Sequence, residues 1–261
     1  MKLPAHVRIA YLPGTGDAVP EALTSIGLAP TMITVADLTP TKLASFDTVI
    51  LGVRAYTANP DLHGAPSQAL LDLARNGGNV LVQYQSADFT STDAPYPLSL
   101  ATGEKVVDET APVQLLTPAS NKSPNPSTAA PSKSPDPSGT GKTRYPEASA
   151  SGLIATEKEG VLTPGYALLN VPNAITPSDF NNWVAERGHG FLTSWNPHYT
   201  ALTDTHDPGG PETAPQLPQR GGLITVQLGK GRWTYCAFAL YRQLPEAVPG
   251  AYRLFVNLLT P

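Results

Sequence analysis

Hydrophobic residues in the first ninety positions fall into short runs that alternate with amphipathic segments. Four apolar runs of strand length predict strands, at residues 7–12, 31–35, 47–53 and 79–84, of which 7–12 and 47–53 are expected to be buried. Three segments between them begin and end with typical helix-boundary residues and predict helices, at residues 17–27, 39–46 and 66–78. Strands and helices that alternate at this spacing predict a doubly wound α/β fold with a parallel sheet.

The predicted helices have identifiable ends. Asp17 can accept backbone N–H groups at the start of the first helix, and Gly27 can end it. Thr39 is the predicted cap of the second helix, with Pro40 as its first residue. Gly77 is expected to close the third helix.

The second half of the chain has a different pattern. Residues 106–116 predict an antiparallel strand, and apolar runs on both sides of Gly229–Arg232 predict a β-hairpin. Helices are predicted at 176–188 and 249–259, and a strand near 190–195.

Residues 117–152 are rich in Pro and Ser and contain almost no apolar side chains. So little apolar surface cannot offset the entropy lost on ordering, so this stretch is predicted to be a disordered insertion. It would interrupt one single domain that spans residues 1–261.

Composition and charge narrow the function classes. The net charge is −4 with no basic block, so the chain lacks the electrostatic footprint of a nucleic-acid binder. No apolar run reaches the roughly 18 residues of a membrane span. No signal peptide is expected either, which leaves the cytoplasm and export as part of a longer protein both open. The single cysteine, Cys236, rules out an internal disulfide and is expected to be a buried apolar residue of a strand.

The turn "LPGTGDAVPEAL" raises the question of nucleotide binding. Gly14 and Gly16 match two glycines of the dinucleotide fingerprint, but Val19 stands where the third belongs. Asp37 would suit a ribose, whereas Asp17 places a negative charge where a pyrophosphate would bind. We therefore expect these glycines to turn the chain, and we expect no cofactor.

Nucleophilic and metal chemistry have little support. Ser86 follows the fourth predicted strand without the flanking glycines of a nucleophile elbow. His206, Asp207 and Glu212 share one loop, but its Pro and Gly residues indicate a turn, and the five histidines form no H-x-x-H pair. We expect no metal site.

Polar and aromatic residues follow several of the predicted strands, whose carboxyl ends border a common crevice in an open α/β sheet. The residues predicted to line this crevice are Asp17, Arg54, Tyr56, Asn59, Gln83, Gln85, Arg242 and Gln243. Arginine with amide and aromatic side chains suits a sugar or carboxylate ligand. An internal hydrogen-bond network that holds the loops is the alternative interpretation.

Five sequence blocks follow one another in a specific order: "GTGDAVPEAL", "GVRAYTAN", "NGGNVLVQYQ", "VPNAITPSDFNNWVAERG" and "YRQLPEAVPGAYRLFVNLL". Together they resemble the C-terminal domain of bacterial PIG-L (LmbE-like) deacetylase proteins, from about residue 6 to the C-terminus apart from 117–152. The resemblance implies a class I glutamine amidotransferase-like, flavodoxin-like α/β fold. Its sheet would be mostly parallel, with antiparallel additions in the C-terminal half.

The resemblance also limits the chemistry. The metal-binding H-P-D-D motif of such deacetylases belongs to another domain and is absent here. The amidotransferase G-x-C-x-G motif is missing, and "RQLPEA" places Leu244 where the histidine of H-P-E would stand. No catalytic residue is therefore expected. The chain is expected to be a non-catalytic accessory or ligand-binding domain, with a PIG-L deacetylase and a carbohydrate as its partners.

Two alternatives stay open. The first is a hydrolase that acts on a sugar or amide, in which Asp17 or Glu246 would serve as general acid or base in the crevice. The second is a structural interaction domain, in which Trp183, Trp195 or Tyr252 would be exposed at a protein interface.

Overall fold

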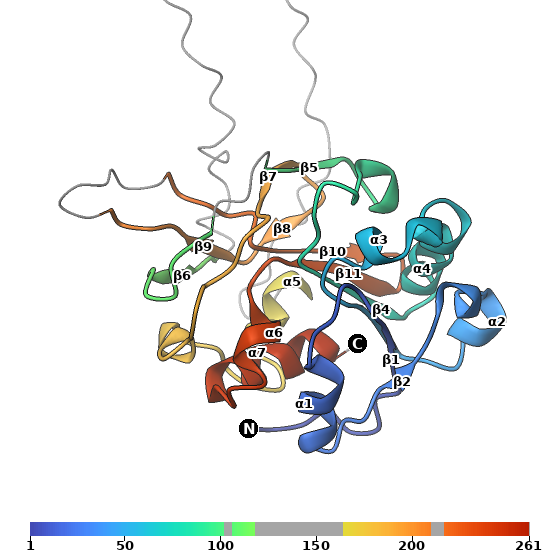
Figure 1. Cartoon of the computed structure of the whole chain (residues 1–261), viewed down its shortest axis with the longest axis horizontal. Helices are drawn as coiled ribbons and strands as arrows, with labels where there is room; N and C mark the ends of the chain where they lie inside the picture. Colours follow the sequence, from blue (N-terminus) through green and yellow to red (C-terminus); the bar gives the residue numbers. More distant parts are fainter. Residues whose placement is uncertain (102–105, 118–163, 210–216, 261) are drawn as a thin grey trace, which may run out of the picture.

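A seven-stranded sheet in the order β2-β1-β3-β4-β11-β10-β8 forms the centre of the molecule (Figure 1). The computed structural model describes residues 1–101, 106–117, 164–209 and 217–260. The sheet strands are β1 (Ile9–Leu12), β2 (Thr31–Met32), β3 (Thr48–Leu51), β4 (Asn79–Gln83), β8 (Thr200–Ala201), β10 (Leu223–Leu228) and β11 (Gly231–Cys236).

The direction of the strands confirms the predicted fold class. β2, β1, β3, β4 and β11 are parallel, whereas β10 and β8 are antiparallel additions at one side. With β11 in the fifth place, the parallel part has the 2-1-3-4-5 order of flavodoxin-like sheets. The chain is therefore an α/β protein with a mostly parallel sheet and antiparallel additions from its C-terminal half.

Helices pack against both sides of this sheet (Figure 1). The longer helices are α1 (Val19–Ser25), α4 (Ala65–Arg75) and α7 (Pro249–Leu259). The hydroxyl of Tyr252 in α7 donates to the carbonyl of Ala22 in α1, so these two helices lie side by side. α4 packs against β4 and β11, with α2 (Pro40–Leu43) beside it.

Shorter elements connect or extend these layers. Single helical turns are α3 (Ala55–Ala58), α5 (Pro164–Ala167), α6 (Leu240–Gln243), η1 (Val35–Asp37), η2 (Pro60–Leu62), η3 (Ser91–Asp93) and η6 (Pro177–Phe180). Two antiparallel ribbons pair β5 (Leu98–Leu100) with β7 (Leu192–Trp195), and β6 (Val113–Leu115) with β9 (Thr203–Thr205).

The central strands lie in the core of the molecule. Every residue of β1, β3 and β4 is buried, which explains why their central residues are consecutive apolar ones rather than alternating with polar ones. The predicted strands at 7–12, 47–53 and 79–84, the hairpin of β10 and β11, and the final helix are confirmed. The strand predicted at 31–35 is shorter, because only the exposed residues Thr31–Met32 pair with β1 and the turn η1 begins at Val35. The predicted strand 106–116 is shorter, because only Val113–Leu115 pairs with β9.

Most of the predicted helix ends are confirmed. Oγ1 of Thr39 accepts the N–H of Lys42 at 3.3 Å, and Pro40 is the first residue of α2. Gly27 and Gly77 follow their helices with φ of 83° and 113°, a region that favours glycine. Asp17 accepts the N–H of Val19 at 3.0 Å from one position before the N-cap residue of α1.

The predicted helix at 176–188 is wrong. Thr176 and Asp179 form a capping box that starts the turn η6, but helical structure ends at Phe180. Asn182 and Ala185 then adopt left-handed φ of 58° and 64°. Long-range contacts described below determine this conformation, and they outweigh the helical pattern of the local sequence.

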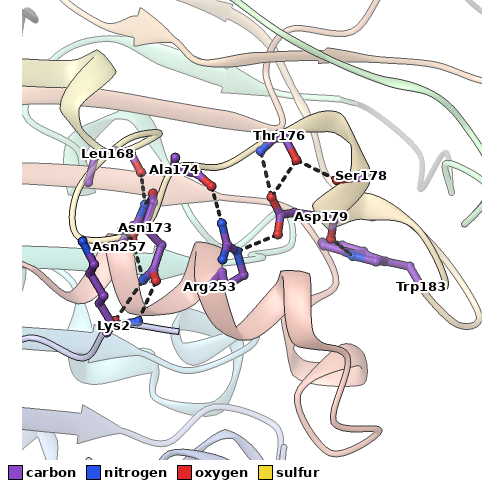
Figure 2. Close-up of polar contacts among 10 residues, drawn as sticks. All are labelled: Lys2, Leu168, Asn173, Ala174, Thr176, Ser178, Asp179, Trp183, Arg253 and Asn257. Atoms are coloured by element: carbon purple, nitrogen blue, oxygen red, sulfur yellow. Dashed lines mark hydrogen bonds and ion pairs between the residues drawn. The ribbon is translucent and has the colours of Figure 1, made fainter.

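α7 is held to the segment before it by a buried polar network (Figure 2). The amide of Asn257 donates to the carbonyls of Leu168 and Asn173 at 2.8 and 2.7 Å, and its oxygen accepts the N–H of Asn173 at 3.0 Å. Arg253 forms an ion pair with Asp179 at 2.8 Å, and the carbonyl of Asp179 accepts the indole N–H of Trp183 at 3.0 Å. This part of the "VPNAITPSDFNNWVAERG" block therefore has a structural role.

Two further predictions meet the limits of the described residues. Residues 118–152 of the predicted insertion lie outside them. Within the described part of the chain, no helix is long and apolar enough to cross a membrane.

Candidate functional site

The turns that follow β1, β3 and β4 meet at the carboxyl edge of the sheet. The turn after β1 touches the one after β3, where the N–H of Thr15 donates to the carbonyl of Val53 at 2.8 Å. A Cβ on Gly14 would lie 1.8 Å from that same carbonyl oxygen, so only glycine fits this approach. Gly14 thus serves the close packing of two turns.

Asp17 is bound within this turn. The Tyr11 hydroxyl lies 2.6 Å from both oxygens of the Asp17 carboxylate, and Nε2 of Gln83 donates to that hydroxyl at 3.2 Å. The N–H of Val53 also donates to Asp17, at 3.3 Å. Burial, and next the adjacent Asp17 charge, raise the pKa of Tyr11 far above its usual range. Asp17 and Gln83 therefore connect β1 to the ends of β3 and β4.

Gln85, Tyr56 and Asn59 bind the backbone of the same turns. Oε1 of Gln85 accepts the N–H of Tyr56 at 3.2 Å, and Nε2 donates to the carbonyls of Gly52 and Gln83 at 3.0 and 2.9 Å. Nδ2 of Asn59 donates to the carbonyls of Pro13 and Ala55, both at 2.9 Å. The Tyr56 hydroxyl lies 2.9 Å from Oγ of Ser67. The structure therefore brings these side chains together as an internal hydrogen-bond network, in which Gln85 and Asn59 bind main-chain groups.

A second group of side chains lies at this edge, and we call it the edge cluster. It consists of Arg54, Tyr84, Glu186, His189, Tyr241 and Arg242. Arg54 has a left-handed φ of 53°, and its guanidinium donates to the Tyr84 hydroxyl at 3.0 Å from Nη2. Its Cζ atom lies 5.3 Å from the centre of the Tyr84 ring, and the His189 ring lies on Tyr84 with 3.8 Å between centroids.

Glu186 is the buried anion of the edge cluster, with a side chain only 6% exposed. It accepts hydrogen bonds from Nε of Arg242 at 2.5 Å and from the Tyr241 hydroxyl at 2.9 Å. Nδ1 of His189 lies 3.6 Å from the same carboxylate, and Nε2 lies 3.3 Å from the Tyr241 hydroxyl. Burial, and then the bond to Glu186, raise the pKa of Tyr241 strongly. The hydrogen bond to Glu186 likewise raises the pKa of Arg242.

The loop that carries Glu186 and His189 is held in an unusual conformation. Ala185 has a left-handed φ, and a Cβ on Gly190 would lie 2.4 Å from the Tyr84 ring. Gln243 fixes the loop, accepting the N–H of Val184 at 2.8 Å and donating to the Val184 and Glu186 carbonyls at 2.9 and 3.2 Å. Strained backbone that is fixed from several sides is common at functional sites.

The sequence-predicted residues thus divide into two sets. Arg54 and Arg242 belong to the edge cluster, while Asp17, Tyr56, Asn59, Gln83, Gln85 and Gln243 bind turns and loops around it. Sequence reasoning missed Tyr84, Glu186, His189 and Tyr241. The available signal was "ERGHG", in which two charged residues and a histidine stand among glycines.

The candidate nucleophiles differ in their surroundings. Cys236 is 1% exposed at the end of β11, and burial raises the pKa of its thiol to about 12. Ser86 lies in the loop after β4, with its Oγ 2.6 Å from Oγ1 of Thr57, which in turn donates to Asp88 at 2.7 Å. The cysteine was correctly expected to be buried in a strand.

The loop considered for metal binding is only partly described. His206 lies 3.6 Å from Asp204, which Arg220 also pairs with at 3.0 Å, while Glu212 falls outside the described residues. Among the residues that the structure describes, no three His, Cys, Asp or Glu side chains are grouped to hold a metal ion.

Two of the three aromatic residues expected at an interface are buried instead. Trp183 is 4% exposed and packs against Phe180 and Phe238. Tyr252 is 9% exposed, because its side chain extends from α7 to α1. Trp195 remains partly exposed on β7.

Comparison with solved structures finds likenesses at low sequence identity. A GMP synthase-like protein of Thermoplasma acidophilum has 9% identity and a TM-score of 0.47, covering 98% of this chain and 96% of its own. A ThuA-like protein of Bacteroides uniformis has 10% identity and a TM-score of 0.49, covering 98% and 91%. A β-galactosidase of Bacillus circulans has 10% identity and a TM-score of 0.41, covering 94% of this chain but 30% of its own. Identities this low concern the fold alone.

No protein-family model and no curated protein matches the sequence. What the chain does must therefore be inferred from its own residues.

Proposed function

We propose that this chain is a non-catalytic ligand-binding domain with a glutamine amidotransferase-like fold, accessory to a PIG-L-type carbohydrate deacetylase. The observation that carries the proposal is the edge cluster. Its charged and aromatic side chains come from four separate segments and meet where open α/β sheets bind their ligands.

The chemistry of the edge cluster suits a sugar or a carboxylate. Two guanidiniums lie over tyrosine rings, Arg54 over Tyr84 at 5.3 Å and Arg242 over Tyr241 at 5.4 Å. Arg242 is 47% exposed, so solvent and ligands reach it. Planar guanidiniums bind hydroxyl or carboxylate oxygens in pairs, and the partly exposed Tyr241 ring lies beside Arg242. Because Glu186 and Gln243 already fix the surrounding loop, little ordering entropy would be lost on binding.

Amidotransferase catalysis lacks its thiolate. The turn after β4 carries Tyr84, Gln85 and Ser86, and the Gln85 side chain is buried in hydrogen bonds. The raised thiol pKa of Cys236 keeps this buried side chain protonated at neutral pH. Leu244, which the resemblance places at the catalytic histidine, is 1% exposed and cannot act as a base.

The association with a PIG-L deacetylase rests on the sequence blocks and their order. Two of these blocks form adjoining parts of the structure, because "VPNAITPSDFNNWVAERG" and the α7 block are joined by Asn257 and Gln243. The hydrolase alternative is weaker, because neither of its two candidate carboxylates is suited to act as an acid or base in the crevice. Asp17 is already bound by Tyr11 and by two backbone N–H groups. Glu246 is exposed to solvent.

A matched pair of arginine variants tests ligand binding at the edge cluster. Arg242→Gln removes the guanidinium that faces solvent there, whereas Arg8→Gln changes a similarly exposed arginine paired with Asp47 elsewhere. Probes are glucosamine, N-acetylglucosamine and glucuronate, and the readouts are thermal shift and calorimetric titration. We expect at least one probe to stabilise the wild type and Arg8→Gln but not Arg242→Gln.

Two outcomes would contradict the proposal. The first is the absence of any effect of the three probes on the wild type, or an equal effect on Arg242→Gln. The second is glutaminase activity that disappears in Ser86→Ala or Cys236→Ala. The accessory role is tested separately, by sedimentation of the chain with a purified PIG-L deacetylase from the same genome. If the two sediment independently, the chain is not an accessory domain of that enzyme.

A further inference from the structure

A group of aromatic and amide side chains lies on the β5–β7 ribbon, apart from the edge cluster. We call it the ribbon surface, and it consists of Tyr96, Trp195, Asn196 and His198. Tyr96 and His198 are stacked, with 4.4 Å between ring centroids and 8° between planes. His198 is exposed, whereas Tyr96, Trp195 and Asn196 are partly exposed. None of the four belongs to the edge cluster or to the network around it.

The stack is held rigidly from below. Tyr199 is buried, its ring meets Tyr96 edge-on at 88°, and its hydroxyl donates to the Tyr96 carbonyl at 2.9 Å. The same hydroxyl accepts the N–H of Tyr96 at 3.1 Å. Trp195 pairs with Leu98 across the ribbon, and the N–H of Asn196 donates to the Pro97 carbonyl at 2.9 Å. Little conformational entropy is therefore left to lose if a ligand lies on this surface.

Asn196 also fixes the orientation of the exposed imidazole. Its Oδ1 accepts the N–H of His198 at 3.0 Å and lies 2.6 Å from Nδ1 of the same residue. With an amide oxygen as acceptor, Nδ1 carries the proton, which leaves Nε2 as a hydrogen-bond acceptor. Nδ2 of Asn196 donates to none of the described residues, so the surface offers a donor as well.

The two chain segments that carry the ribbon surface contain no charged side chain. Neither 94–101 nor 188–203 contains an Asp, Glu, Lys or Arg, although the chain has 38 such residues, 17 basic and 21 acidic, in all. A polyanion such as a nucleic acid requires cationic contacts, and charged peptides require opposite charges. A neutral surface of ring faces with one donor and one acceptor is complementary to a molecule that is itself neutral and amphipathic.

We propose that the ribbon surface binds a neutral pyranose, as part of a polysaccharide. A pyranose ring presents C–H groups on its face, which pack on the exposed side of the His198–Tyr96 stack. An equatorial hydroxyl at the edge of this sugar then accepts a hydrogen bond from Nδ2 of Asn196, and the in-plane lone pair of Nε2 of His198 is left for a hydroxyl of a neighbouring sugar. Trp195, partly exposed on β7, is a further aromatic residue of the same ribbon. The ribbon surface would hold a polymer while the edge cluster binds a single ligand.

A matched pair of histidine variants tests this surface. His198→Asn removes the outer ring of the stack but keeps a polar residue, and His6→Asn makes the same change at an exposed position outside the ribbon. Asparagine also tolerates the left-handed φ of 56° at residue 6. The probes are hydroxyethyl cellulose and mannan, which are neutral, and alginate, which carries carboxylates. The measurements are retention in polysaccharide-containing native gels and quenching of Trp195 fluorescence, assigned with Trp195→Phe.

We expect a neutral polysaccharide to retard the wild type and His6→Asn, and to bind His198→Asn about fivefold more weakly. Alginate should not retard the wild type or either variant more strongly than the neutral polysaccharides do. The proposal is overturned if neither neutral polymer retards the wild type, if His198→Asn is retarded equally, or if alginate alone binds. It is also overturned if light scattering shows a dimer that His198→Asn dissociates, because a second copy would then be the occupant. Circular dichroism of each variant shows that the fold is retained.

Discussion

At the scale of single residues, burial decides which candidate groups can react. Cys236 and Glu186 are both almost inaccessible, but only Glu186 has charged and polar partners. A buried thiol favours its neutral form, whereas the Glu186 carboxylate accepts hydrogen bonds from Arg242 and Tyr241. The sequence predicted the cysteine correctly, because a cysteine within an apolar run is usually a small core residue.

The thiol pKa predicts how stability depends on pH. The pKa of Cys236 is about 12 in the folded protein and 9.0 when the side chain is free of burial. Because burial raises the pKa of the thiol in the folded protein, the protonated thiol stabilises the folded state fully below pH 9. This stabilisation is lost as the pH rises toward 12, by about 1.4 kcal/mol per pH unit. Urea unfolding at pH 8 and pH 10 should show a larger loss for the wild type than for Cys236→Ala. An equal loss in both proteins would contradict a buried, protonated thiol, as would rapid labelling of native protein by a thiol reagent at pH 8.

At the scale of elements, the helices and strands that could be predicted are those whose ends the local sequence marks clearly. β1, β3, β4 and α7 were predicted because glycine or proline borders or lies within each of these apolar runs. The segment 181–190 was not, because contacts from a distant residue hold it: Gln243 binds Val184 and Glu186. Because residues 176–188 were predicted to be a helix, nothing in the sequence indicated that Glu186 and His189 lie close to Tyr84. The arginines of the edge cluster were predictable from strand order, but their partners were not.

Asn257 connects α7 to this segment, which predicts a large effect of its loss. Asn257→Ala leaves the buried N–H of Asn173 and the carbonyls of Leu168 and Asn173 without their partner. We expect a loss of about 2 kcal/mol or more in the free energy of unfolding. Asn170→Ala is the control, because Asn170 is exposed and donates one bond to the Tyr166 carbonyl; it should cost less than about 1 kcal/mol. Similar midpoints for the two variants in urea unfolding would show that the network in Figure 2 does not hold α7 in place.

At the scale of the whole molecule, the parallel sheet is a rigid support for the edge cluster and the ribbon surface. Both of these lie on loops or on short strands outside the central strands. β1, β3, β4 and β11 are buried and paired on both sides, whereas the ribbon of β5 and β7 has only two strands. Two-stranded ribbons depend on packing against the rest of the protein for their stability. The edge cluster combines both kinds of support, since Arg54 and Tyr84 follow core strands and Glu186 lies on a loop.

Hydrogen exchange should resolve this gradient. Amides of β3, β4 and β11 should exchange only through global unfolding, because each lies between two paired neighbours in the core. Amides of β5 and β7 should exchange through smaller openings, so their rates should exceed those of the core strands by at least an order of magnitude. Addition of a neutral polysaccharide should slow exchange at 192–199, and addition of the sugar that stabilises the wild type should slow it at 184–190. If both ligands protected the same peptides, or if the ribbon exchanged as slowly as β4, the two surfaces would not be separate sites on a common rigid sheet.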